Sequence, residues 1–136
     1  MIYLLDTNAC IAIINDAPGV ARERFAAALA KGATIAVSAV AAFELWYGVD
    51  KRVRREFNTR RVTTFLAGPV EIVPFDEQDA REAGRVRATL ERKGTPIGAY
   101  DALIAGQALA RNAIVVTANA SEFGRVAGLT REDWTR

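Results

Sequence analysis

Three acidic residues stand among apolar neighbours, which is unusual for side chains that prefer water. Asp6 follows the apolar run 2–5. Glu44 is the only charged residue of segment 34–48, and Asp101 lies in an alanine-rich segment. An unpaired buried charge costs several kcal/mol, so these carboxylates are expected to be paired, protonated or bound to a metal. Local roles remain open as well: Asp6 and Asp101 suit helix caps, and Glu44 suits a solvated stripe of a helix.

The composition narrows the chemistry that these carboxylates could perform. The 136-residue chain has no histidine and a single cysteine, Cys10. Imidazole is therefore excluded as a general base, and one thiolate cannot build a zinc site alone. A catalytic metal would have to be held by oxygen, which favours Mg²⁺ or, as the alternative, Mn²⁺. The lone cysteine also excludes an intrachain disulfide, as is typical of a cytoplasmic protein.

The hydrophobic pattern predicts short strands that alternate with helices. Strands are expected at 2–5, 34–37, 71–75 and 113–117, and helices at 9–15, 20–31, 38–46, 51–67, 76–92 and 101–111. Asp76 is expected to cap its helix, with Asp79 completing a capping box, and Glu132 and Asp133 to lie in a polar tail. The alternation predicts an α/β fold: a Rossmann-like α/β/α sandwich around a mostly parallel, four- to five-stranded sheet, forming one domain over 1–136.

The predicted sheet gives the acidic residues a common location. Ligands of parallel sheets bind beyond the carboxyl ends of the strands. Asp6 follows the first strand, and Asn119 and Glu122 follow the last one. We therefore expect these distant segments to meet in one crevice. No apolar stretch approaches the ~20 residues that cross a bilayer, so no membrane association is expected.

A basic run occupies the middle of the chain. Lysine and arginine outnumber acids there, with Lys51, Arg52, Arg54, Arg55, Arg60 and Arg61 against Glu56. Such a run is either a solvated helix face or a surface that contacts phosphates, because cations near a polyanion release its counterions. The net charge of +2 and the pI of about 9.0 permit a nucleic-acid partner without requiring one.

Ordered short motifs resemble those of a known family. They are Leu-Leu-Asp6-Thr7-Asn8, the lone Glu44 before Gly48, Ile97-Gly98 ahead of Asp101, and Thr117-x-Asn119-x-x-Glu122-Phe123. Together with Arg125-Val-x-Gly-Leu129 and Glu132-Asp-Trp134, they resemble a PIN domain of the VapC type, the toxin of bacterial toxin–antitoxin pairs. The likeness spans nearly the whole chain, and its specificity lies in the order of the motifs.

The resemblance implies a metal-dependent endoribonuclease. It assigns Asp6, Glu44 and Asp101 as acidic metal ligands, and Glu122 as the fourth, because Asn119 stands where the family often has an acid. Supporting roles fall to Thr7, Asn8, Thr117 and Asn119. The implied reaction is in-line attack by a Mg²⁺-activated water that leaves a 5′-phosphate. The implied partners are an RNA substrate, a VapB-type antitoxin, and a second copy in a homodimer within a toxin–antitoxin hetero-oligomer.

Other interpretations of these residues differ in what they require. A phosphatase of the haloacid dehalogenase type needs a second aspartate where this chain has Asn8, and a response-regulator receiver needs an acidic pair there. The remaining alternative is an inactive PIN-like module that binds RNA or protein. Asn119 favours it, because an amide there replaces an acid that the family often has. The helix near Trp46 and Tyr47 is a candidate partner surface, although such aromatic residues more often belong to the core.

Overall fold

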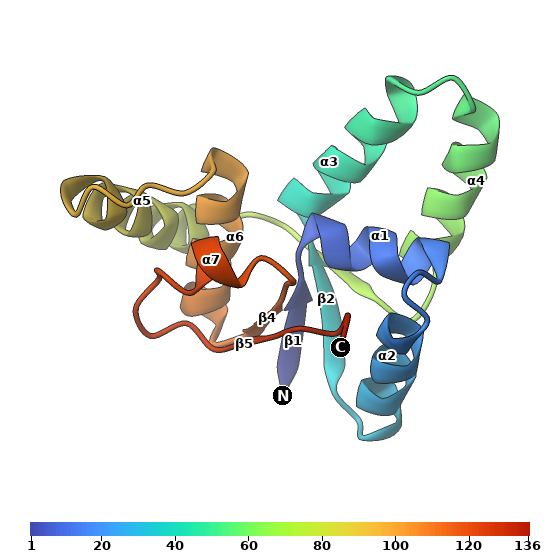
Figure 1. The fold of residues 1–136 in the computed structure, drawn as a ribbon, viewed down its shortest axis with the longest axis horizontal. Helices are drawn as coiled ribbons and strands as arrows, with labels where there is room; N and C mark the ends of the chain where they lie inside the picture. The colour runs from blue at the N-terminus through green and yellow to red at the C-terminus, as the bar shows by residue number, and fades with distance from the viewer.

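The computed structural model describes residues 1–136, and a five-stranded parallel sheet lies at its centre (Figure 1). The strands are β1 (Ile2–Leu5), β2 (Thr34–Ser38), β3 (Glu71–Val73), β4 (Ile114–Val116) and β5 (Arg131–Glu132), in the order β3-β2-β1-β4-β5. The predicted α/β class is confirmed. The polar-tail prediction is wrong for Glu132, which lies in β5 and pairs with Val116. A strand of two residues is too short to show the alternation of apolar and polar side chains by which strands are predicted from sequence.

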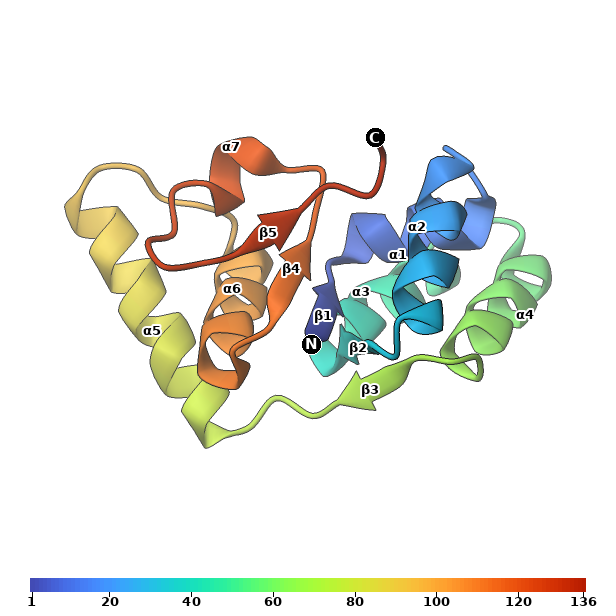
Figure 2. The same ribbon diagram turned by 90° about the horizontal axis from the view of Figure 1, so that it is seen from below.

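Helices cover both faces of this sheet. They are α1 (Thr7–Asn15), α2 (Val20–Ala30), α3 (Ala39–Asp50), α4 (Arg55–Leu66), α5 (Glu77–Arg92), α6 (Ala99–Arg111) and α7 (Ala120–Phe123). In Figures 1 and 2, α1 to α4 lie on one side of the sheet, and α5, α6 and α7 lie on the other. None of these helices combines the length and the apolarity that crossing a membrane requires.

The predicted helix over 51–67 is shorter in the structure. The chain turns through 51–54, and α4 begins only at Arg55. The turn has a tertiary cause: α4 runs back so that Val62, its one buried residue, joins the core that α1 and α3 also line. Lys51, Arg52 and Arg54 therefore belong to a connection, in which their side chains are exposed.

The register of the strands aligns the residues that follow them. Leu5 is level with Val37 of β2 and Val116 of β4, and all three side chains are buried. The next residues, Asp6, Ser38 and Thr117, therefore stand together at the carboxyl edge of the sheet. Backbone hydrogen bonds continue the alignment there, since the N–H of Asp6 donates to the carbonyl of Val116 at 3.1 Å.

Candidate active site

Asp6 lies between β1 and α1 and is only 5% exposed. Its Oδ1 accepts a 2.7 Å hydrogen bond from the N–H of Ala9, so the residue does cap α1, as its local interpretation predicted. Burial raises the pKa of Asp6, the Thr117 hydroxyl and the Ala9 N–H lower it, and the charge of Glu44 raises it further. The start of α1 thus holds Oδ1 of Asp6, and the acidic neighbours make the Asp6 carboxyl group easier to protonate.

Glu44 projects from α3 toward the start of α1. Its Oε1 accepts a 2.7 Å hydrogen bond from the hydroxyl of Thr7. The expectation that Glu44 is a buried charge was wrong. Glu44 is half-buried, and α3 exposes Phe43 and Tyr47 to solvent. The helix is apolar without being enclosed, a distinction that composition alone does not make.

The Asp101 and Glu122 carboxylates approach each other beside Gly98. A Cβ built on Gly98 would lie 3.6 Å from Asp101 Oδ2 and 3.8 Å from Glu122 Oε2, so both carboxylates converge on this glycine. Burial, a hydrogen bond to Glu122, and the charges of Glu122, Asp6 and Glu44 raise the pKa of Asp101 to about 7. The same hydrogen bond lowers the pKa of Glu122. The two carboxylates therefore titrate as a pair, in which Asp101 is the more readily protonated member.

The capping role considered for Asp101 is not what the structure shows. Gly98 occupies the N-cap position of α6, and no side chain caps this helix. Asp101 lies in the first turn, where the positive end of the helix dipole favours a negative charge.

Asn119 caps the short helix α7 and orients Glu122. Its Oδ1 accepts a hydrogen bond from the N–H of Glu122, and its Nδ2 donates to Glu122 Oε2 at 3.1 Å. The hydroxyl of Thr117 accepts from the N–H of Asn119 at 2.9 Å, which links this turn to the edge beside Asp6. Asn8 is exposed at the start of α1 and makes no side-chain hydrogen bond. The structure thus brings Thr117 and Asn119 to the acidic site and leaves Asn8 at its margin.

The predicted ligands all offer oxygen atoms. No group of three or more histidine, cysteine, aspartate or glutamate side chains stands close enough together to hold an ion as the side chains lie. The charges of Asp6 and Glu44 nevertheless raise the pKa of Asp101, so the three carboxylates lie within electrostatic range of one another. Oxygen donors with excess negative charge suit a hard divalent cation such as Mg²⁺.

The basic residues lie at the far end of α3. Lys51, Arg52 and Arg54 occupy the turn, and Arg55 begins α4 with its guanidinium 3.8 Å from Asp50. The Lys51 ammonium lies 5.0 Å from the centre of the Tyr47 ring, and Arg54 lies over Phe57. Of the basic residues, Arg52 and Arg61 line the same groove as Glu44.

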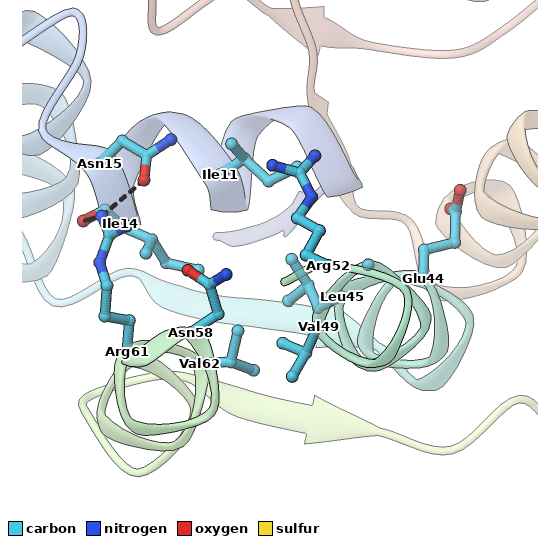
Figure 3. A pocket seen from close by; sticks show the side chains of 11 residues that line it. Ile11, Ile14, Asn15, Glu44, Leu45, Val49, Arg52, Asn58, Arg61 and Val62 are labelled. Carbon is cyan, nitrogen blue, oxygen red and sulfur yellow. Dashed lines mark hydrogen bonds between the residues drawn. The ribbon is translucent and has the colours of Figure 1, made fainter. Parts of the chain in front are cut away.

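This groove, of about 210 Å³, runs between α1, α3 and α4 (Figure 3). Its apolar lining comes from Ile11, Ile14, Leu45, Val49 and Val62. Glu44 lies at one end, and Asn15 and Arg61 lie at the other, where Arg61 hydrogen-bonds Asn15 and the carbonyl of Ile14. The groove therefore connects the acidic site with an apolar surface.

One acidic neighbour of the site was missed by sequence reasoning. Asp133 was assigned to the tail, but it follows β5 at the edge that carries Asp6 and Thr117, and its charge raises the pKa of Asp6. Burial raises the pKa of Asp133, but hydrogen bonds from Thr135 and the nearby Arg136 guanidinium together leave it lowered. The only sequence signal is its place directly after a strand of two residues.

The match to known proteins decides the family. The PIN domain model matches residues 3–129. The chain belongs to the PIN domain family. This PIN domain is 41% identical to the tRNA(fMet)-specific endonuclease VapC of Salmonella typhimurium over 132 residues, which cover 97% of each chain. It is also 41% identical to ribonuclease VapC2 of Rickettsia felis over the full length of both.

Solved structures agree with the sequence relatives. The PIN domain superposes on VapBC2 from Rickettsia felis, bound to a DNA fragment from their promoter, with a TM-score of 0.92 at 40% identity, covering 98% of this chain and 99% of that one. DNA-bound VapBC from Salmonella typhimurium gives a TM-score of 0.90 at 40% identity, covering 98% of each chain. The predicted resemblance to VapC-type PIN ribonucleases is confirmed. Nucleases of this kind generally depend on a divalent metal ion.

Proposed function

We propose that this PIN domain, acting as one unit over residues 1–136, hydrolyses RNA phosphodiester bonds with Mg²⁺ or Mn²⁺ held by Asp6, Glu44, Asp101 and Glu122. The observation that carries the proposal is the convergence of the Asp101 and Glu122 carboxylates on Gly98. Burial raises the pKa of Asp101 to about 7 together with the charges of Glu122, Asp6 and Glu44, so the Asp6 and Glu44 carboxylates also lie nearby. Such crowding of like charges is unfavourable without a cation, and perturbed carboxylates of this kind cluster at functional sites.

Each residue has a defined part in this proposal. A divalent ion bound there supplies positive charge for the scissile phosphate and a water of lowered pKa. Asp6 is fixed by the N–H of Ala9, and Glu44 is fixed by the Thr7 hydroxyl. Asn119 holds Glu122 beside Asp101. These hydrogen bonds restrict Asp6, Glu44 and Glu122, and the carboxylates would move closer together to bind an ion, because they are too far apart to hold one as they lie.

The basic turn extends the same surface. We assign Lys51, Arg52, Arg54 and Arg55 to contacts with RNA phosphates, because they are exposed on the turn after α3, which carries Glu44, and at the first residue of α4. Such contacts add affinity that falls with salt and carry no sequence information. Sequence or shape selection then depends on other features of the substrate.

The substrate proposed for this chain is transfer RNA. The supporting observation is the 41% identity to a protein named tRNA(fMet)-specific endonuclease VapC, at 97% coverage of each chain. We expect the reaction to take place in the cytoplasm, where that substrate is found.

A VapB-type antitoxin is the partner proposed for the groove between α1, α3 and α4. Its apolar lining suits an inserted segment, and Glu44 at its end lets the same segment reach the acidic site. Similarity to VapBC complexes from two bacteria supports this assignment. A homodimer within a larger toxin–antitoxin assembly is proposed on the same ground.

The decisive experiment compares the wild type with Asp6→Asn and Asp101→Asn in cleavage of tRNA. Each substitution should reduce the rate by about a hundredfold or more in Mg²⁺ or Mn²⁺, and EDTA should abolish cleavage by the wild type. The control is Glu77→Gln, an acid exposed at the start of α5 and outside the site. Undiminished cleavage by both Asn variants would place the active site elsewhere. RNA binding without cleavage by the wild type would favour the inactive module.

A further inference from the structure

Three exposed aromatic rings gather beside the acidic site, with Phe43 between the other two. Phe43, Tyr47 and Tyr100, the aromatic cluster, are 51%, 58% and 46% exposed. Phe43 and Tyr47 have ring centres 6.4 Å apart at an interplanar angle of 20°, and Phe43 meets Tyr100 edge-on at 5.6 Å. Large rings gathered on a surface mark a binding site more often than rings scattered singly.

The cluster joins α3 and α6, two of the helices that carry catalytic candidates. Phe43 directly precedes Glu44 on α3, and Tyr100 directly precedes Asp101 on α6. Tyr47 follows Glu44 by three residues, so its side chain neighbours that of Glu44 on the helix surface. The rings and the carboxylates thus come from the same turns of α3 and α6, so nucleotides that flank a phosphate at the carboxylates can reach the rings.

Positive charge borders the cluster on the side of the basic turn. The Lys51 ammonium lies 5.0 Å from the centre of the Tyr47 ring, and Arg52 and Arg54 follow in the exposed turn. Exposed rings that stack bases, beside cations that track phosphates, are the combination by which proteins bind single-stranded nucleic acids. Charge complementarity thus favours RNA over an apolar protein segment at this surface.

Building on the proposed ribonuclease function, we propose that Phe43, Tyr47 and Tyr100 form a stacking platform for unpaired bases next to the scissile phosphate, with Lys51 holding a neighbouring phosphate. The platform selects RNA whose cleavage site is single-stranded, because a base inside a duplex cannot reach the rings. It therefore sets which segment of a folded RNA is cut, independently of the carboxylates that perform the chemistry.

The test measures RNA binding without cleavage, in the full chain carrying Asp6→Asn. A fluorescein-labelled single-stranded oligoribonucleotide and its duplex serve as probes in fluorescence anisotropy. Phe43→Leu and Tyr47→Leu keep an apolar side chain and remove the ring, and each should weaken single-strand binding by about fivefold or more. Tyr47→Trp should retain it. Ile72→Ala, which removes an exposed apolar side chain on β3 outside the cluster, is the control and should leave binding unchanged.

Three results would overturn the platform. The first is equal single-strand affinity in the parent and the Leu variants, and the second is equal affinity of the parent for single strand and duplex. The third is a Leu variant that changes the sedimentation coefficient while keeping its RNA affinity, since the cluster would then be an interface between copies of the chain. Cleavage of tRNA by the wild type is measured separately, so failure of the platform is distinguishable from failure of the nuclease proposal.

Discussion

The hydroxyl of Thr7 donates a 2.7 Å hydrogen bond to Glu44 Oε1 and thereby ties the first residue of α1 to the middle of α3. Because the bond fixes the orientation of a proposed metal ligand, Thr7→Val should lower the rate of RNA cleavage by about 10- to 100-fold. Thr7→Ser keeps the hydroxyl and should stay within a few-fold of the wild type. The measurement is single-turnover cleavage across a Mg²⁺ titration, in which Thr7→Val should also require more Mg²⁺. Equal rates for the Val and Ser variants would remove Thr7 from the site.

The acidic site should make the metal-free protein less stable as pH rises. Folding raises the pKa of Asp101 from 3.8 to about 7, so between these values the folded state binds more protons than the unfolded state. The free energy of unfolding therefore falls as pH rises through this window. Asp101→Asn removes the cost of ionising this side chain in the folded state. It should be more stable than the wild type by about 1–2 kcal/mol at pH 8, with solvent screening taken into account.

Urea unfolding in EDTA at pH 4.5 and pH 8 checks this expectation, because most of the difference should vanish at the lower pH. Glu77→Gln, measured in the same way, is the control. If the free energies of unfolding of Asp101→Asn and the wild type differ equally at both pH values, the repulsion among the carboxylates is relieved in the folded state.

Asp79 is predicted to stabilise the fold although it lies outside the active site. It is 1% exposed and accepts hydrogen bonds of 3.0 Å from Gln107 Nε2 and from an Arg111 guanidinium nitrogen. Burial raises the pKa of Asp79, but the bonds from Arg111, the Asp76 N–H and Gln107 outweigh it and leave the pKa lowered. This stabilisation is complete above about pH 4 and is lost as pH falls through the lowered pKa.

Asp79→Ala leaves Gln107 and Arg111 without their shared acceptor and should lower the free energy of unfolding by about 3 kcal/mol. Urea denaturation at pH 7 measures the loss, with Glu77→Ala as the control on the same helix. A loss no larger than that of the control would show that solvent replaces the carboxylate.

The features that the sequence predicted well depend on local interactions. Asp6 and Asp76 cap helices as expected, and Asp79 completes the capping box with Asp76. Each of these bonds joins residues at most three positions apart, so the residue type and its place before an apolar pattern suffice to predict it. The parallel sheet followed from alternation, and the meeting of Asp6 with the Glu122 segment followed from the sheet.

The features that the sequence did not predict depend on tertiary packing. The turn before α4 exists so that Val62 reaches the core, and the burial of Asp79 exists because Gln107 and Arg111 face it from α6. Asp133 reaches the site edge through a strand of only two residues. In each case the deciding partner lies far along the chain, where periodicity and capping rules carry no information.

The contact between α5 and α6 depends on the absence of a side chain at Gly106. A Cβ on this residue would lie 2.3 Å from the backbone N and Cα of Ala83, far inside van der Waals contact. Gly106→Ala must therefore push the two helices apart and should destabilise the fold by about 1–3 kcal/mol. This loss outweighs the gain of up to ~1 kcal/mol that alanine brings to a helix interior.

Gly84→Ala is the matched control for this prediction. Gly84 lies on α5 beside Ala83, yet a Cβ there would meet nothing within 4 Å. The substitution should therefore stabilise the protein by about 0.5–1 kcal/mol, because alanine loses less backbone freedom than glycine on folding. Thermal unfolding should place the Gly106→Ala midpoint below that of the wild type and the Gly84→Ala midpoint above it. Since Asp101 lies on the same helix as Gly106, a displaced α6 should also slow RNA cleavage in Gly106→Ala and leave Gly84→Ala fully active.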